Sequence, residues 1–287
     1  MNPDDYCQEK AAKSGSSFYY SFLFLPPERR RAITALYAFG REVDDVVDKC
    51  SDTSIAHTKL AWWRTQVDQL FQGKAEHPVA QALLPHLQSC SITRERLTAI
   101  IDGMEMDLNQ TRYLDWPGLR AYCWHAAGVV GELSASVFGY SDPQTLVYAE
   151  KLGLTFQLTN IIRDVGDAAR RGRIYLPVNE MQQFGVKASD ILNGVYSDEF
   201  TALMKFQTER ARSLYREAMQ NLPDVDRRAQ RPGLMMAAIY YALLDEIERD
   251  NWQVLHQRIS LTPLRKLWLT WKTWVSGGRC LVHRLAR

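Results

Sequence analysis

The chain has 287 residues, of which 46% are hydrophobic and 24% are charged, as is ordinary for a globular protein. Its net charge of +2 is too small to indicate a polyanionic partner, and we expect no nucleic-acid binding. The five cysteines show no C-x-x-C spacing, which argues against a zinc site or a disulfide framework. The polar start and the lack of any apolar run of ~18 residues predict a cytoplasmic protein without a signal peptide or a membrane span.

Long segments with apolar residues three and four positions apart predict helices along most of the chain. In chain order, the clearest predicted helices lie at 28–49, 58–72, 93–112, 144–169, 198–221 and 233–257. Prolines fall between these segments, where they mark helix starts and loops. No alternating strand pattern, repeat or composition break interrupts the series. The sequence therefore predicts a single all-α domain over residues 1–287.

The stretch GREVDDVVDKC, residues 40–50, crowds acidic side chains onto one side of the first long helix. At ~100° per residue, its charged side chains fall within about 100° of arc and the valines lie opposite. These charged residues are Arg41, Asp44, Asp45 and Asp48. Because like charges at this spacing repel, the pattern indicates a bound divalent metal. The alternative is a solvated face on which Arg41 pairs with Asp45.

A second polar cluster follows the same logic within FQLTNIIRDVGDAARRGRIYLP, residues 156–177. Amide and carboxylate side chains there fall within about 80° of arc on a helix. They are Gln157, Asn160, Asp164 and Asp167. Their oxygens suit Mg²⁺, and several nearby arginines suit phosphate. We expect the two helices to face each other across a cavity and to hold Mg²⁺ ions around a diphosphate.

The motifs REVDDVVD and QLTNIIRDVGDAARRGRIYLP resemble the two aspartate-rich motifs of the squalene and phytoene synthase family. The resemblance extends over nearly the whole chain. It includes SFYYSFLFLPPERRRAITALYAFGREVDDVVD, YCWHAAGVVGE and YYALLDEIERDNWQVLHQR. Within that family, the chain is most similar to bacterial presqualene diphosphate synthases of hopanoid biosynthesis.

The resemblance implies an all-α isoprenoid synthase fold with one central cavity, and Mg²⁺ as cofactor. The implied catalytic residues are Asp44, Asp48, Tyr122 and Asp164. The implied metal ligands are Asp44, Asp48, Asn160 and Asp164. The implied substrate contacts are Ser17, Arg41, Tyr122, Gln157, Arg163, Arg173, Tyr240 and Arg258. Without the resemblance, Tyr122 and Tyr240 would be interpreted as core tyrosines and Arg258 as a surface charge.

The chain departs from the family pattern at two places. Ala168 stands where the second motif usually ends in aspartate, and we expect Asp167 to be a metal ligand in its place. The alternative is that Asn160 and Asp164 suffice. Near the N-terminus, Ser14 stands where some relatives carry a polar side chain, such as histidine, that can reach a diphosphate.

The implied reaction is the Mg²⁺-dependent head-to-head (1′-1) condensation of two farnesyl diphosphates to presqualene diphosphate, with release of diphosphate. The released diphosphate and Tyr122 are both candidates for the proton acceptor. Alternatives are phytoene synthase, which would act on geranylgeranyl diphosphate, and squalene or dehydrosqualene synthase. A non-enzymatic alternative is an inactive helical membrane adaptor, for which the altered second motif is the only support.

The C-terminal tail, residues 263–287, differs from the rest because no acidic residue follows Asp250. Its lysines and arginines alternate with leucines and tryptophans, a pattern that can lie on an anionic membrane surface. The alternative is a helix that packs on the core with a cationic outer side. The predicted partners are thus prenyl diphosphates and, through this tail, the inner face of a membrane.

Overall fold

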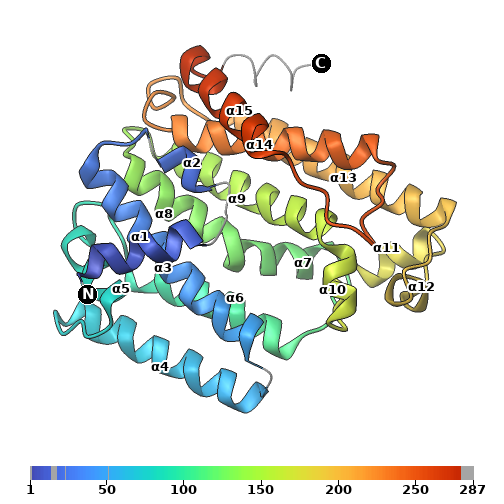
Figure 1. The fold of residues 1–287 in the computed structure, drawn as a ribbon, viewed down its shortest axis with the longest axis horizontal. Coiled ribbons are helices and arrows are strands. Elements are labelled where there is room, and N and C mark those ends of the chain that lie inside the picture. The colour runs from blue at the N-terminus through green and yellow to red at the C-terminus, as the bar shows by residue number, and fades with distance from the viewer. Residues whose placement is uncertain (1, 14–17, 23, 51, 279–287) are drawn as a thin grey trace.

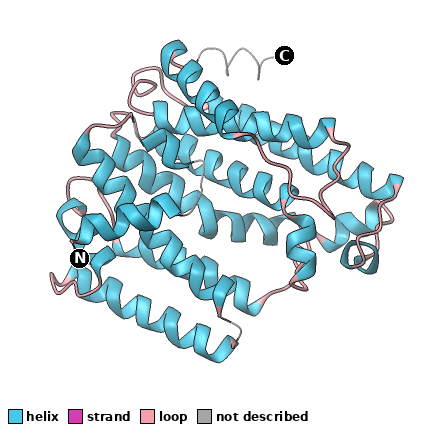
Figure 2. Ribbon diagram, in the orientation of Figure 1, coloured by secondary structure: helices cyan, strands magenta, loops and turns pink. Residues whose placement is uncertain are grey.

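Every regular element in the described part of the chain is a helix, which confirms the all-α prediction (Figure 2). The computed structural model describes the chain except for residues 1, 14–17, 23, 51 and 279–287. The α-helices of the first half are α1 (Pro3–Lys13), α2 (Phe18–Phe22), α3 (Pro27–Lys49), α4 (Thr53–Phe71), α5 (Pro78–Leu83), α6 (Arg94–Asn109), α7 (Trp116–Cys123) and α8 (Val129–Phe138). Those of the second half are α9 (Gln144–Arg163), α10 (Val165–Arg170), α11 (Val178–Gln183), α12 (Ala188–Leu192), α13 (Asp198–Gln220), α14 (Arg231–Arg249) and α15 (Pro263–Ser276). Two short turns, the 3₁₀ turn η1 (Leu84–His86) and the π turn η2 (Trp124–Gly128), complete the set.

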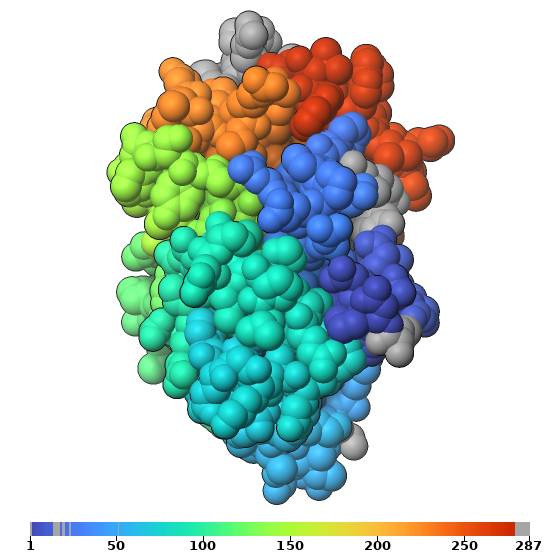
Figure 3. All heavy atoms as spheres, turned by 90° about the vertical axis from the view of Figure 1, so that its left-hand side faces the viewer, coloured from blue at the N-terminus to red at the C-terminus, as the bar shows by residue number. Residues whose placement is uncertain are grey.

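The buried residues form two large clusters with a cavity between them. One cluster comes from α1, α3 to α6 and α8, and the other from α9 to α14. Figure 1 shows these groups below and above the middle of the molecule, and Figure 3 shows the early helices beneath the orange and red C-terminal ones. Helices α3, α6, α8, α9 and α14 all contribute to the cavity wall.

Helix α3 forms one side of this cavity because its two faces differ in polarity. Pro27 occupies its first turn, where a missing N–H costs nothing. Leu36, Phe39 and Val43 recur at three- and four-residue spacing and are buried. The charged side chains predicted from the sequence are left on other faces of the same helix.

Two glycines let α8 and α9 approach unusually closely. A Cβ atom at Gly131 would lie 2.2 Å from the carbonyl oxygen of Ala149, and one at Gly153 would lie 2.3 Å from that of Ala127. No other residue fits at either position. The π turn η2 just before α8 presents Ala126 and Ala127 to the cavity, and such turns often lie at functional sites.

Two of the predicted helices are longer than the observed ones. The prediction of 144–169 is wrong because Asp164, with φ −104° and ψ 19°, separates α9 from α10. The prediction of 233–257 is wrong because α14 ends at Arg249, and Asn251 and Trp252 then adopt positive φ angles of 48° and 52°. These breaks turn the chain back toward the cavity. In the described ranges, no helix has both the length and the apolar character that crossing a bilayer requires.

Candidate active site

The cavity between the two clusters has a volume of about 500 Å³, with one polar and one apolar end. The polar end lies at the C-terminal ends of α3 and α9, and the apolar end includes Phe22, Phe138 and Tyr148. Tyr148 precedes Asn160 by 12 residues, which is about 18 Å along α9. The cavity can therefore take a polar head group at one end and a long apolar chain behind it.

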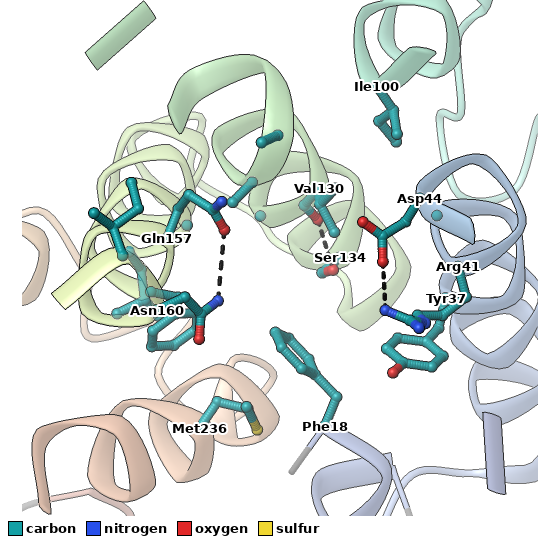
Figure 4. A pocket seen from close by; sticks show the side chains of 18 of the residues that line it. Phe18, Tyr37, Arg41, Asp44, Ile100, Val130, Ser134, Gln157, Asn160 and Met236 are labelled. Atoms are coloured by element: carbon teal, nitrogen blue, oxygen red, sulfur yellow. Dashed lines mark hydrogen bonds and ion pairs between the residues drawn. The ribbon is translucent and has the colours of Figure 1, made fainter. Parts of the chain in front are cut away.

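The α3 wall directs two of its three aspartates toward the cavity. Asp44 and Asp48 line it, and Arg41 forms an ion pair with Asp44. Figure 4 shows Arg41 and Asp44 facing Gln157 and Asn160 of α9 across the cavity. Asp45 does not line it and instead accepts hydrogen bonds of 2.8 Å from both Lys10 and Lys49. It also accepts one of 3.2 Å from Arg41 Nη2, the pair that the solvated-face alternative predicted. The expected metal face is thus narrower than the sequence suggested, because Asp45 belongs to surface ion pairs.

Asp44 lies in a recess where its charge is poorly compensated. Burial, with the neighbouring charges of Asp48 and Asp45, raises its pKa to about 6 although Arg41 acts in the opposite direction. A carboxylate in this state is stabilised by any added cation. On the α3 wall, Asp44 is therefore short of positive charge.

On the α9 wall, by contrast, the carboxylate has enough positive charge around it. Asp164 accepts hydrogen bonds from Arg163 Nε at 2.7 Å and from Arg258 Nε at 2.9 Å. Burial alone would raise the pKa of Asp164, but these two arginines outweigh it and lower the pKa. The expectation of arginines at this wall is met by side chains from both α9 and the loop after α14.

The backbone of the loop after α14 brings Arg258 to this position through Gly166. The amide N of Gly166 donates to Val254 O at 3.2 Å, and a Cβ atom at Gly166 would lie 2.1 Å from Leu255 O. Only glycine permits this contact. Gly166 is thus the packing point for the loop that carries Arg258.

Asp167 and Ala168 both line the cavity, although α9 does not continue through them. Asp167 pairs with Arg170, and its Oδ2 lies 3.8 Å from Arg258 Nε. Its carboxylate therefore reaches the polar end by the break at Asp164 rather than by the helical geometry that we expected.

A single arginine links the two walls. Arg171, which follows α10, donates from Nη1 to Asp48 Oδ1 at 2.8 Å. This bond joins the end of the second motif to the first motif across the cavity mouth. Arg173 also lines the cavity, with its Nη1 3.9 Å from Asp107 Oδ2.

The oxygen donors of both walls fit Mg²⁺. Asn160 Oδ1 is buried without a hydrogen-bond partner, so an acceptor is left open at the cavity. Within the described residues, no cluster of three or more His, Cys, Asp or Glu is arranged to hold a metal by itself. Mg²⁺ commonly binds through one or two carboxylates and completes its shell with water and phosphate oxygens. The donor set therefore suits metals that arrive together with a diphosphate.

The structure adds a buried carboxylate that the sequence interpretation missed. Asp107 on α6 accepts hydrogen bonds from Tyr122 at 3.0 Å and from Tyr175 at 2.9 Å. Burial raises the pKa of Asp107, and burial beside Asp107 raises that of Tyr122 well above its ordinary value. The signal was available, because Asp107 shares a helical face with the apolar Ile100 and Met104.

Lys266 on α15 was also missed as a site residue. It is half-buried, and burial together with the charges of Arg163 and Arg258 lowers its pKa. It therefore lies within electrostatic reach of the arginines at the α9 wall, although it does not line the cavity.

Two predicted substrate contacts are not placed in the cavity wall. Tyr240 is buried and does not line the cavity, with its ring centroid 4.6 Å from that of Phe156, but it interacts with Asn160 and Arg163, which do line it. Ser17, like Ser14, lies outside the described residues. Gln157 does line the cavity, and its amide lies 3.4 Å from the Tyr122 hydroxyl.

Comparison with known proteins identifies the family. The squalene/phytoene synthase family model matches residues 11–265. The chain is 35% identical to the 15-cis-phytoene synthase of Synechococcus elongatus over 273 residues, which cover 91% of this chain and 89% of that protein. It is 33% identical to the chloroplastic phytoene synthase of Narcissus pseudonarcissus. That match covers 92% of this chain but only 64% of the Narcissus protein, less than two thirds of its length.

Solved structures agree with this assignment. A dehydrosqualene synthase superposes with a TM-score of 0.84 at 26% identity, covering 96% of each chain. The squalene synthase HpnC of Alicyclobacillus acidocaldarius superposes with a TM-score of 0.75 at 25% identity, covering 87% of this chain and 94% of that one. The predicted isoprenoid synthase fold is thus confirmed, and the chain belongs to the squalene/phytoene synthase family of prenyltransferases.

Proposed function

We propose that this protein catalyses the Mg²⁺-dependent 1′-1 condensation of two prenyl diphosphates and releases diphosphate. The observation that carries the proposal is the pair of facing walls at the polar end of an apolar cavity, one with Asp44 and Asp48 and the other with Asn160 and Asp164. The test is incubation of the pure protein with prenyl diphosphates and Mg²⁺, followed by assay of pyrophosphate and mass spectrometry of the lipid. No pyrophosphate release, as expected of an inactive adaptor, or equal release in EDTA would contradict the proposal.

In this proposal, the two walls divide the work on the diphosphate. Asp44, Asp48, Asn160, Asp164 and Asp167 are the proposed metal ligands. When bound, Mg²⁺ neutralises the negative charge that develops on the leaving diphosphate. Arg41, Arg163 and Arg258 are placed to bind phosphate oxygens, which arginine forks match in shape. Departure of the diphosphate with the bonding electron pair leaves an allylic cation at C1 of the first chain.

The apolar walls shield this cation from water until the second chain reacts. The 2,3-double bond of the second chain attacks C1, and loss of a proton closes a cyclopropane ring. A raised pKa disfavours a tyrosinate at Tyr122. Its hydroxyl can instead accept the proton while passing its own to Asp107, to which it already donates at 3.0 Å. The released diphosphate is the other candidate acceptor.

The similar proteins favour a longer prenyl chain than the farnesyl chain that we expected from the sequence. The curated relatives with 33% and 35% identity bear the name phytoene synthase, which favours geranylgeranyl diphosphate over farnesyl diphosphate. We therefore take phytoene synthesis as the first candidate. Incubation with an equimolar mixture of both substrates, with identification of the products by mass, tests this choice directly.

Formation of presqualene diphosphate from farnesyl diphosphate is the second candidate. It is supported by the aromatic side chains of Phe22, Phe138 and Tyr148 at the apolar end, because they limit the length of chain that fits. It is also supported by the structural similarity to a dehydrosqualene synthase. If farnesyl diphosphate is the substrate, we expect Tyr148→Ala to let the cavity accept a longer prenyl chain. We also expect added NADPH to leave the product unchanged.

Peripheral membrane contact through α15 is a further part of the proposal. Leu264, Trp268, Trp271 and Val275 are all more than half exposed, in a helix that otherwise packs on α14. The outer side of this helix is therefore apolar rather than cationic, unlike the alternative considered from the sequence. Vesicle sedimentation of the full chain and of a Trp268→Ala/Trp271→Ala variant tests this contact, which should weaken in the variant.

A further inference from the structure

A second cavity, of about 560 Å³, lies behind the apolar end of the substrate cavity and is lined by three arginines. Arg29 comes from α3, Arg228 from the segment before α14, and Arg231 from the first turn of α14. Pro232 lines both cavities, so the two are neighbours. We refer to the second one as the arginine cavity.

These three arginines lack acidic partners. In the described part of the chain none of them forms an ion pair, whereas the adjacent Arg227 pairs with Asp224 at 3.2 Å. Arg231 Nε is buried without a hydrogen-bond partner. Arg29 is bound to the carbonyl oxygen of Phe138 at the C-terminal end of α8, so Arg228 and Arg231 are the two guanidinium groups available to an anion. Arginine forks favour phosphate.

The one carboxylate among the residues that line the arginine cavity is already occupied. Asp226 accepts hydrogen bonds from the backbone N of Ser141 at 2.7 Å and of Asp142 at 2.9 Å. It also accepts a hydrogen bond from the Thr145 hydroxyl at 2.7 Å. Since Asp226 holds the α8–α9 loop, it does not neutralise the arginines.

The arginine cavity adjoins the exposed apolar side of α15. Trp274 lines the cavity, the Arg231 guanidinium lies 5.1 Å from the Trp274 ring, and the Phe24 ring lies 5.1 Å from the same tryptophan. Figure 3 shows the segments concerned meeting on one face, where the blue, lime, orange and red surfaces approach one another. Apolar anchors and uncompensated cations thus lie next to each other.

Helix α15 itself supplies few of those cations. Arg265 pairs with Glu246, and Lys266 is half-buried. Only Lys272 remains exposed among the basic residues of α15. The described part of the tail therefore provides mainly apolar contact, and the arginine cavity adds positive charge for an anionic surface.

We propose that the arginine cavity binds the phosphate of an anionic phospholipid while the exposed side chains of α15 enter the interface of the bilayer. This inference deepens the membrane contact proposed above and does not depend on the length of the prenyl chain. Arginine near an anionic bilayer and tryptophan at its interface are both favourable. The apolar end of the substrate cavity, which shares Pro232 with the arginine cavity, would then face the membrane that receives the apolar product.

The test compares the full-length wild type with Arg228→Gln and Arg228→Gln/Arg231→Gln by sedimentation with vesicles. The vesicles contain phosphatidylcholine with or without phosphatidylglycerol. We expect binding to the anionic vesicles to weaken about fivefold for each arginine removed, the equivalent of ~1 kcal/mol. Arg120→Gln is the matched control, because Arg120 is also exposed and forms no ion pair in the described part of the chain, yet lies on α7 outside both cavities.

Pyrophosphate release in detergent separates this inference from the catalytic proposal, because Arg228→Gln should leave that release unchanged. Arg228 is exposed, so this variant remains interpretable if the double variant melts early. Anionic vesicle binding by Arg228→Gln equal to wild type would overturn the inference, and so would equal binding of wild type to neutral vesicles. A thermal shift by inorganic phosphate that Arg228→Gln loses, with vesicle binding intact, would reassign the cavity to soluble phosphate and also overturn it.

Discussion

The α3 and α9 walls of the substrate cavity carry similar residues but hold them in opposite electrostatic states. On α3, burial and two neighbouring aspartates raise the pKa of Asp44, and only Arg41 lowers it. The result is a pKa of about 6. On α9, Asp164 has Arg163 and Arg258, and its pKa falls. The α3 wall therefore gains most from added cations, whereas the α9 wall already holds enough cations to bind an anion.

This difference teaches that an aspartate-rich motif does not define a metal site by itself. The same carboxylate is a vacant acceptor or an arginine partner according to what the rest of the fold brings to it. In this protein, the loop after α14 delivers Arg258 to Asp164, whereas Arg171 reaches Asp48 and leaves Asp44 with Arg41 alone. We therefore expect the α3 wall to control the metal requirement and the α9 wall to control the affinity for diphosphate.

The largest expected effect is that of Asp44→Asn. Pyrophosphate release should fall by ~10²-fold or more, because a preorganised charge at the reacting group is lost. Asp45→Asn is the matched control, since Asp45 is adjacent but does not line the cavity; it pairs with Lys10 and Lys49 and more weakly with Arg41, which keeps its pair with Asp44, so this variant should keep most of the wild-type turnover. Equal losses in the two variants would mean that the motif acts through its total charge and not through the cavity face.

Asp44→Asn should also stabilise the metal-free protein. The folded pKa of about 6 exceeds the ordinary value of 3.8, so the folded state binds the proton more tightly; stability therefore falls as the pH rises from about 4 to about 6, and the loss is complete above that. Removal of the carboxylate should add up to ~1 kcal/mol at pH 8, allowing for partial solvent exposure, and nothing below pH ~4. Urea unfolding in EDTA at both pH values measures the difference.

Gly166→Ala should reduce activity by roughly tenfold, because the new Cβ displaces the backbone that places Arg258. Arg258→Gln should cause a similar loss. A double variant that is no worse than either single one would show that both act through the same contact. If the losses multiply, Gly166 acts through some other part of the second motif.

Asp164→Asn should destabilise the metal-free protein, in contrast to Asp44→Asn. It leaves Arg163, which is mostly buried, without its main counter-charge, and we expect a loss of about 1–3 kcal/mol. Because the pKa of Asp164 is lowered on folding, this stabilisation is present above pH ~4 and is lost as the pH falls further. A gain of stability in Asp164→Asn at pH 8 would reverse the assignment of the two walls.

The smallest expected effect concerns Asp167. We expect Asp167→Ala to raise the Mg²⁺ concentration needed for half-maximal turnover about threefold, since a carboxylate at this distance can act through a metal-bound water. Ala168→Asp should be neutral or should lower that requirement. An unchanged Mg²⁺ profile in Asp167→Ala would show that Asn160 and Asp164 suffice.

Local patterns in the sequence were enough to predict the helices and the two facing walls. The spacing of Asp44, Asp48, Asn160 and Asp164 depends on one helical period each, and all four line the cavity. What the sequence could not supply was the direction of Asp45, because its partner Lys10 is 35 residues away. Helical periodicity in the sequence does not reveal contacts between residues that are far apart along the chain.

The break at Asp164 shows the same limit at the level of the backbone. The helical pattern of 144–169 continues through it, whereas in the structure α10 begins as a separate helix beside the close contact of Gly166 with Leu255. Asp107 and Lys266 were missed for a similar reason, since each acquires its role from partners on other helices. Tyr240, conversely, matched a motif but lies behind the cavity wall.

Thermal unfolding of the wild type and Asp44→Asn, in EDTA and in Mg²⁺ with pyrophosphate, tests the central claim most directly. The account predicts that Asp44→Asn melts higher than the wild type in EDTA. It also predicts that Mg²⁺ with pyrophosphate stabilises the wild type strongly but the variant much less. A variant that melts lower in EDTA and keeps the full Mg²⁺-pyrophosphate shift would contradict the claim that the α3 wall is the metal-requiring side of the cavity.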